Sequence, residues 1–152
     1  MFDTLYSQVG AVFTGLVILF AFWKGDEPEK IAAAAYGLGW FAAAAYGLGW
    51  FASMLVQDDG NIYGAQWSMM AIDLVMLGVL GALVWKARRA WAVWATAMQL
   101  LVFASHVLML VDMRPSISAY YFVINLAGYG VLLAIGVGAF WAWQERRAAG
   151  LE

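Results

Sequence analysis

The sequence predicts an all-α integral membrane protein, a bundle of five transmembrane helices that forms a single domain over residues 1–152. Hydrophobic residues make up 65% of the chain and charged residues only 12%, whereas a soluble domain carries about 25% charged residues. The apolar residues also fall into five stretches that meet or approach the roughly 20 residues needed to cross a hydrocarbon layer. The predicted spans are residues 5–23, 31–56, 67–85, 91–111 and 120–143.

The first span, residues 5–23, begins behind Asp3 and has no basic segment before it. It also lacks the small-residue cleavage site that a removable signal peptide carries. We therefore expect this stretch to remain in the protein as a span.

The second span, residues 31–56, contains an exact tandem repeat, because residues 32–41 read AAAAYGLGWF and residues 42–51 read the same. With both copies the helix is about 39 Å long, so it must tilt or protrude from the bilayer. The repeat also places small residues at a four-residue spacing, which lets another helix approach closely. We predict a helix-packing stripe, with a dimerisation face as the alternative, at Ala35, Gly39, Ala43 and Gly47.

The third, fourth and fifth spans are separated by short charged segments, residues 86–89 and 112–116. Glycines in the third and fifth spans, such as Gly78 and Gly138, are expected to allow close contacts between helices. The connecting segments leave no room for a soluble domain, so any activity is expected in the bundle, in the lipid or in a partner.

Basic residues gather on alternate connecting segments, and only Arg114 lies on the opposite side. Because short cytoplasmic loops are enriched in Lys and Arg, we predict an outside N-terminus and a cytoplasmic C-terminus, in a bacterial inner membrane. Tryptophan prefers the membrane interface, so those at the predicted cytoplasmic ends are expected to form an anchoring belt. They are Trp23, Trp85, Trp91, Trp94, Trp141 and Trp143.

Polar residues in the last three spans lie at one predicted depth. Counting about 1.5 Å per residue from the predicted outer ends places Asp73 about 9 Å deep, and His106 and Asn125 about 8 Å deep. We predict a polar cluster in the outer half of the bundle, with Asp73 ionised or sharing a proton with His106, because an unpaired buried carboxylate is costly. Residues expected near this level are Gln8, Ser105, Tyr129, Ser7 and Ser53, with Gln99 two turns deeper than His106.

Two interpretations of this cluster stay open. Its members can simply join helices, since an interhelical hydrogen bond in a membrane contributes about 0.6 kcal/mol on average. They can also form a pathway for protons or a small solute, because placing an aspartate and the only histidine inside a membrane costs more free energy than joining helices requires. The sequence thus predicts a small transporter or channel-like protein, or a structural or accessory subunit, with a holin-like permeabilising protein as a third candidate.

Other classes of function are not expected. The chain has no cysteine, no clustered basic surface for nucleic acid and no clustered spacing of metal ligands. One histidine offers a haem only one axial ligand, and Ser105 cannot face its chain neighbour His106 on a helix. We therefore expect no enzyme, no cofactor and no metal. The expected partners are the lipid bilayer and either a second copy of the chain or a larger membrane complex.

Overall fold

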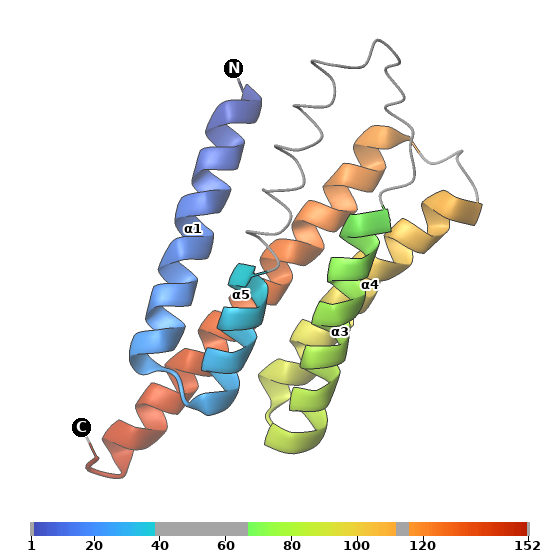
Figure 1. The fold of residues 1–152 in the computed structure, drawn as a ribbon. Coiled ribbons are helices and arrows are strands. Elements are labelled where there is room, and N and C mark those ends of the chain that lie inside the picture. The colour runs from blue at the N-terminus through green and yellow to red at the C-terminus, as the bar shows by residue number, and fades with distance from the viewer. Residues whose placement is uncertain (1, 39–66, 112–115, 152) are drawn as a thin grey trace.

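The computed structural model describes residues 2–38, 67–111 and 116–151, and every regular element in these ranges is a helix. The all-helical fold predicted from the sequence is therefore confirmed for this part of the chain. Figure 1 shows the helices side by side as a bundle. They are α1 (Phe2–Lys24), a helical segment over residues 27–38, α3 (Trp67–Ala87), α4 (Ala90–Val111) and α5 (Ile117–Ala148).

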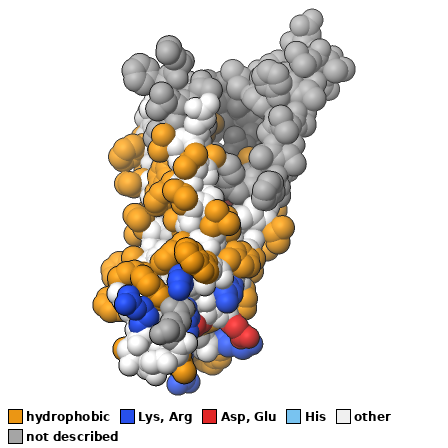
Figure 2. All heavy atoms as spheres, turned by 90° about the vertical axis from the view of Figure 1, so that its left-hand side faces the viewer, with side chains coloured by type: hydrophobic (Ala, Val, Ile, Leu, Met, Phe, Trp, Pro, Cys, Tyr) orange, Lys and Arg blue, Asp and Glu red, His pale blue; other side chains and the backbone are white. Residues whose placement is uncertain are grey.

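Three of these helices are long and apolar enough to cross a membrane, namely Met69–Ala87, Ala90–Val111 and Ser118–Ala148. Residues Gln8–Lys24 of α1 form a shorter apolar helix. Large apolar side chains are exposed along the bundle, as Figure 2 shows, which is the surface expected of helices in contact with lipid. The three long helices match the third, fourth and fifth predicted spans.

Helix α5 is longer than its predicted span, because it begins at Ile117 and ends at Ala148 instead of covering residues 120–143. Ser116 caps its N-terminus, where the serine side chain accepts a hydrogen bond from the backbone N–H of Ala119 at 3.2 Å. At about 1.5 Å per residue, its 32 residues extend beyond a hydrocarbon layer about 30 Å thick. Its last turns therefore reach the end of the bundle where charged residues such as Glu145 and Arg146 lie.

Specific backbone features form the turns at this end. The Glu29 carboxylate reaches back to the backbone N–H of Asp26 at 3.0 Å, as in a capping box, and so starts the 27–38 segment. Arg88 has a positive φ of 50°, a conformation typical of residues that end helices, and it lies between α3 and α4. These two turns bring Asp26 and Arg89 together, although they are 63 residues apart in the sequence.

Alanine makes up half of the buried core, as expected where helices pack closely without a hydrophobic driving force. Helix α4 packs against both α3 and α5, and α1 packs against α5. Ala35, the first residue of the predicted packing stripe, is partly buried against this core. The other three stripe residues, Gly39, Ala43 and Gly47, lie outside the described residues. The core includes Ala21, Ala32, Ala33, Leu80, Ala92, Ala95, Ile135 and Ala139.

Gly138 is a position where a side chain has no room. A Cβ added there would lie 2.6 Å from Cδ1 of the Trp91 indole ring, a distance that real Cβ contacts do not show. We expect Gly138→Ala to lower the free energy of unfolding by about 1–3 kcal/mol, the usual cost of overpacking a core. Unfolding of the purified protein in mild detergent would measure this change. Gly78→Ala is the control, because nothing lies within 4 Å of a Cβ added at Gly78, and an equal loss in both variants would contradict the packing argument.

Candidate functional site

The bundle contains a cavity of about 480 Å³. Residues of α1, the 27–38 segment, α3, α4 and α5 all line it, so the cavity exists only when the helices assemble. Its volume falls in the range of about 300–1,000 Å³ that is usual for small-molecule sites. The apolar part of the lining includes Met69, Ile72, Met76, Val102, Ile124 and Leu132. The polar residues that line it are Thr14, Tyr36, Asp73, Gln99, His106, Tyr121, Asn125 and Tyr129.

Asp73 and His106 are in direct contact on the wall of this cavity. His106 Nε2 lies 2.9 Å from Asp73 Oδ2, and the two side chains are 9% and 19% exposed, respectively. Gln99 donates from Nε2 to Asp73 Oδ1 at 2.9 Å, so each carboxylate oxygen has one partner from α4. Gln99 and His106 can both reach Asp73 because seven residues make almost two full helical turns, which places both side chains on one face of α4.

The second ring nitrogen of His106 is held by Tyr120 at the start of α5. Tyr120 Oη lies 2.6 Å from His106 Nδ1, and the two rings meet edge to face. An ionised Asp73 only accepts hydrogen bonds, so His106 Nε2 must carry a proton, and in the neutral histidine Tyr120 donates to Nδ1. In the charged histidine Nδ1 donates instead, and the tyrosine hydroxyl accepts. The three side chains can therefore hold or release one proton without losing either contact.

Most of the predicted polar cluster lies around one cavity. Asp73, Gln99, His106, Asn125 and Tyr129 all line it. Gln99, two turns along α4 from His106, contacts the other oxygen of the same carboxylate.

Other predicted members lie elsewhere or outside the described part of the chain. Ser105 donates to the carbonyl oxygen of Leu101 at 2.8 Å, within its own helix, and Gln8 is exposed. Ser53 and the side chain of Ser7 lie outside the described residues.

Four polar residues of the site, Thr14, Tyr36, Tyr120 and Tyr121, are not predicted from the sequence. Tyr36 donates from its hydroxyl to the carbonyl oxygen of Gly128 at 3.1 Å, which joins the 27–38 segment to α5 beside the cavity. Tyr120 starts a predicted span, where tyrosine is commonly an interface anchor. No spacing in the sequence marks these residues, although Gln99 was detectable from its seven-residue separation from His106 on one helix.

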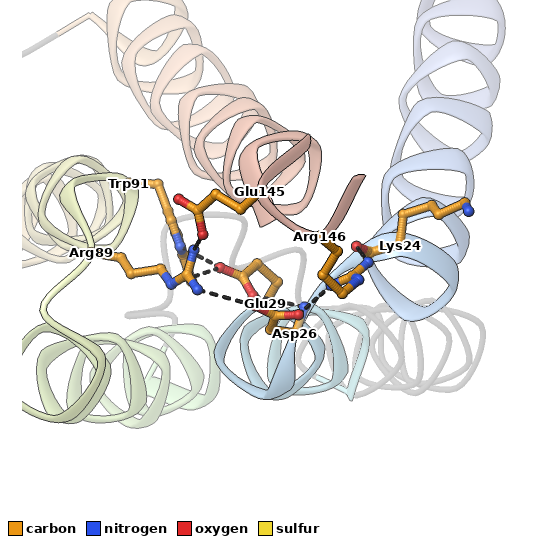
Figure 3. A network of polar contacts seen from close by, with 7 residues as sticks. All are labelled: Lys24, Asp26, Glu29, Arg89, Trp91, Glu145 and Arg146. Carbon is orange, nitrogen blue, oxygen red and sulfur yellow. Dashed lines mark hydrogen bonds and ion pairs between the residues drawn. The ribbon is translucent and has the colours of Figure 1, made fainter. Parts of the chain in front are cut away.

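A second polar cluster joins the charged ends of the helices (Figure 3). Glu29, which is 0% exposed, accepts a hydrogen bond from Trp91 Nε1 at 2.7 Å. Arg89 lies among three carboxylates, with contacts of 3.1 Å to Asp26, 3.9 Å to Glu29 and 3.1 Å to Glu145. We call this group, Asp26, Glu29, Arg89, Trp91 and Glu145, the charged-end network. It links the turn between α1 and the 27–38 segment, the turn between α3 and α4, and helix α5.

Arg146 adds a second cation to the charged-end network, through contacts with the Asp26 carboxylate and the carbonyl oxygen of Lys24. Trp91 belongs to this network, and its indole is only 6% exposed. The prediction that Trp91 anchors the protein at the membrane interface is therefore wrong, because its N–H is needed to satisfy the buried Glu29. Trp23, Trp85, Trp94 and Trp141 of the predicted belt are exposed.

Within residues 2–38, 67–111 and 116–151, no three histidine, aspartate or glutamate side chains come together as metal ligands. The cavity and the charged-end network are thus the two polar sites of the described chain to be considered for function. Comparison of the chain with protein-family models, with curated proteins and with solved structures finds no match.

Proposed function

We propose that this protein is a small transporter or channel-like protein of the bacterial inner membrane, in which the Asp73–His106 pair carries a proton beside a solute cavity. The observation that carries this proposal is the 2.9 Å contact between the two side chains on the wall of a cavity of about 480 Å³. Ionisable residues within a membrane are costly and usually mark pathways or proton relays. If the two charged groups only joined helices, apolar side chains packed in their place would do so at a lower cost in free energy.

The proposed membrane arrangement has five spans, with the N-terminus outside and the C-terminus in the cytoplasm. The three long apolar helices and the apolar Gln8–Lys24 support it, and the 27–38 segment continues in the sequence as an apolar stretch. Basic side chains gather at one end of the bundle in Figure 2, as expected of a cytoplasmic side. At that end lie the charged-end network and the junction of α3 with α4 (Figure 1).

The chemistry proposed for the cavity needs only the residues that line it. A proton reaching Tyr120 can pass to His106 Nδ1, because a hydroxyl can both donate and accept. Protonation of the ring changes the net charge of the Asp73–His106 pair from −1 to 0. The charge presented to the cavity therefore depends on whether His106 holds a second proton.

Proton flux into proteoliposomes that contain a pH-sensitive dye tests this function. We expect the protein to carry protons down an imposed gradient, and Asp73→Asn to reduce the flux to the level of empty liposomes, since the neutral amide cannot balance the charge of a protonated His106. The flux should also depend on pH, because the charge of the Asp73–His106 pair changes when His106 binds a second proton.

Ser105→Ala is the matched control, because Ser105 is adjacent to His106 but bonds only to its own helix. Equal flux through the native protein and Asp73→Asn, or none through either, would refute the transport function. The absence of flux together with a co-purifying membrane complex would favour a structural subunit instead. Collapse of the membrane potential in growing cells that survives Asp73→Asn would favour a holin-like protein.

A further inference from the structure

We propose that the cavity binds a small organic cation with an apolar body, such as a quaternary or protonated amine, in competition with the proton on His106. This inference rests on the proposed transport function and names its substrate class. Its basis is the juxtaposition of one accessible carboxylate, three tyrosine side chains and an apolar wall around a single cavity.

The fixed charges around the cavity favour cations. Asp73 is the one acidic residue among the described residues that line the cavity, and none of these is lysine or arginine. The sequence also has no lysine or arginine between Lys30 and Lys86, a stretch that includes the whole of the second predicted span. An anion entering the cavity would therefore meet the Asp73 carboxylate with only His106 to balance it. A cation meets a charge of the opposite sign.

The Asp73 carboxylate retains the capacity to receive such a ligand. His106 and Gln99 each contact one of its two oxygens, whereas an ionised carboxylate can accept about four hydrogen bonds. Its side chain is also more exposed than that of His106, at 19% against 9%. The carboxylate is therefore positioned by its partners and is not closed off by them.

The rest of the lining suits an apolar cation better than a metal ion or a sugar. Tyr36, Tyr121 and Tyr129 bring aromatic rings, whose faces attract ammonium groups within about 6 Å. Met69 and Met76 add flexible, polarisable side chains that adapt to an irregular ligand. A volume of about 480 Å³ admits a molecule with an aromatic or branched body, and a bare inorganic ion would leave most of it unfilled.

Protons compete with the cation because His106 and the ligand share one carboxylate. The titratable groups that face His106 or the cavity are Asp73 from α3, Tyr120, Tyr121 and Tyr129 from α5, and Tyr36 from the 27–38 segment. The residues that α1 contributes, Gly10 and Thr14, do not titrate. With a neutral histidine, the site has a net charge that a cation balances. With a protonated histidine, the site is already neutral, so the cation should bind less tightly.

Calorimetric titration of the full chain in mild detergent with benzyltrimethylammonium tests the inference. Neopentylbenzene, which has the same shape without the charge, and benzenesulfonate, which has the opposite charge, are the matched ligands. We expect the cation to bind at least about tenfold more tightly than either, because a charge pair and cation–π contacts are both lost in the controls. We also expect its affinity to fall as the pH is lowered, because a protonated His106 already balances the charge of Asp73.

Asp73→Asn should weaken cation binding about tenfold or more, whereas Ser105→Ala should leave it unchanged. The ligand and pH comparisons use the native protein, so they decide the question even if Asp73→Asn does not fold. Equal binding of cation and neutral isostere, or tighter binding at low pH, would overturn the inference. Cation binding without proton flux would remove the transport function alone, and flux without cation binding would remove the substrate class alone.

Discussion

Arg89→Met is expected to lower the free energy of unfolding by about 3 kcal/mol, near the lower end of the 3–5 kcal/mol lost when one partner of a buried ion pair is removed. Arg89 contacts three carboxylates, one of which, Glu29, is fully buried. Without the guanidinium, Glu29 keeps only its hydrogen bonds from Trp91 and the Asp26 backbone. The lower end of the range applies because the Arg89 side chain is 28% exposed, so water partly replaces it.

Equilibrium unfolding in mixed detergent micelles would measure this loss. Lys86→Met is the matched control, because it removes the same charge from the exposed end of α3, one turn away. Arg89→Lys should recover part of the stability, since it restores the charge but not the forked geometry that contacts several carboxylates. If Arg89→Met and Lys86→Met are equally stable, the charged-end network does not hold the helices together, and the hydrogen bonds from Trp91 and the Asp26 backbone are enough to satisfy Glu29.

The Asp73–His106 pair is expected to show a coupling free energy of about 2 kcal/mol in a double-mutant cycle with Asp73→Asn and His106→Leu. His106→Leu leaves a largely buried carboxylate with Gln99 as its partner, which should be strongly destabilising. Asp73→Asn in the same chain removes that unbalanced charge, so the double variant should lose less stability than the two single losses together.

The size of this coupling separates the two interpretations of the polar cluster. A value near the 0.6 kcal/mol average of interhelical hydrogen bonds would mean that the pair only joins α3 and α4. A larger value, which increases when the pH is lowered, would indicate an ion pair, because protonation of the ring adds charge attraction. Ser105→Ala serves as the control for the cycle, since its hydroxyl bonds within α4.

Much of the cavity site was predictable from the sequence because depth along a helix follows from counting residues. Asp73, His106 and Asn125 were placed at one level by the helical rise alone, and all three line the cavity. The contact of Tyr120 with His106 was not predictable, because it depends on the rotation of α5 about its axis and on its distance from α4. The burial of Glu29 was also missed, since a carboxylate in a charged connecting segment is usually solvated.

The sequence by itself determined the all-helical class of the described chain and the positions of its three long apolar helices. These properties depend on composition and on the rise per residue, which are local. Only the tertiary structure decided which polar groups meet. Trp91 and Glu29 are 62 residues apart, and Arg146 and Asp26 are 120 apart. Such contacts depend on how helices are rotated and packed against one another, a property of the assembled bundle that no single segment carries.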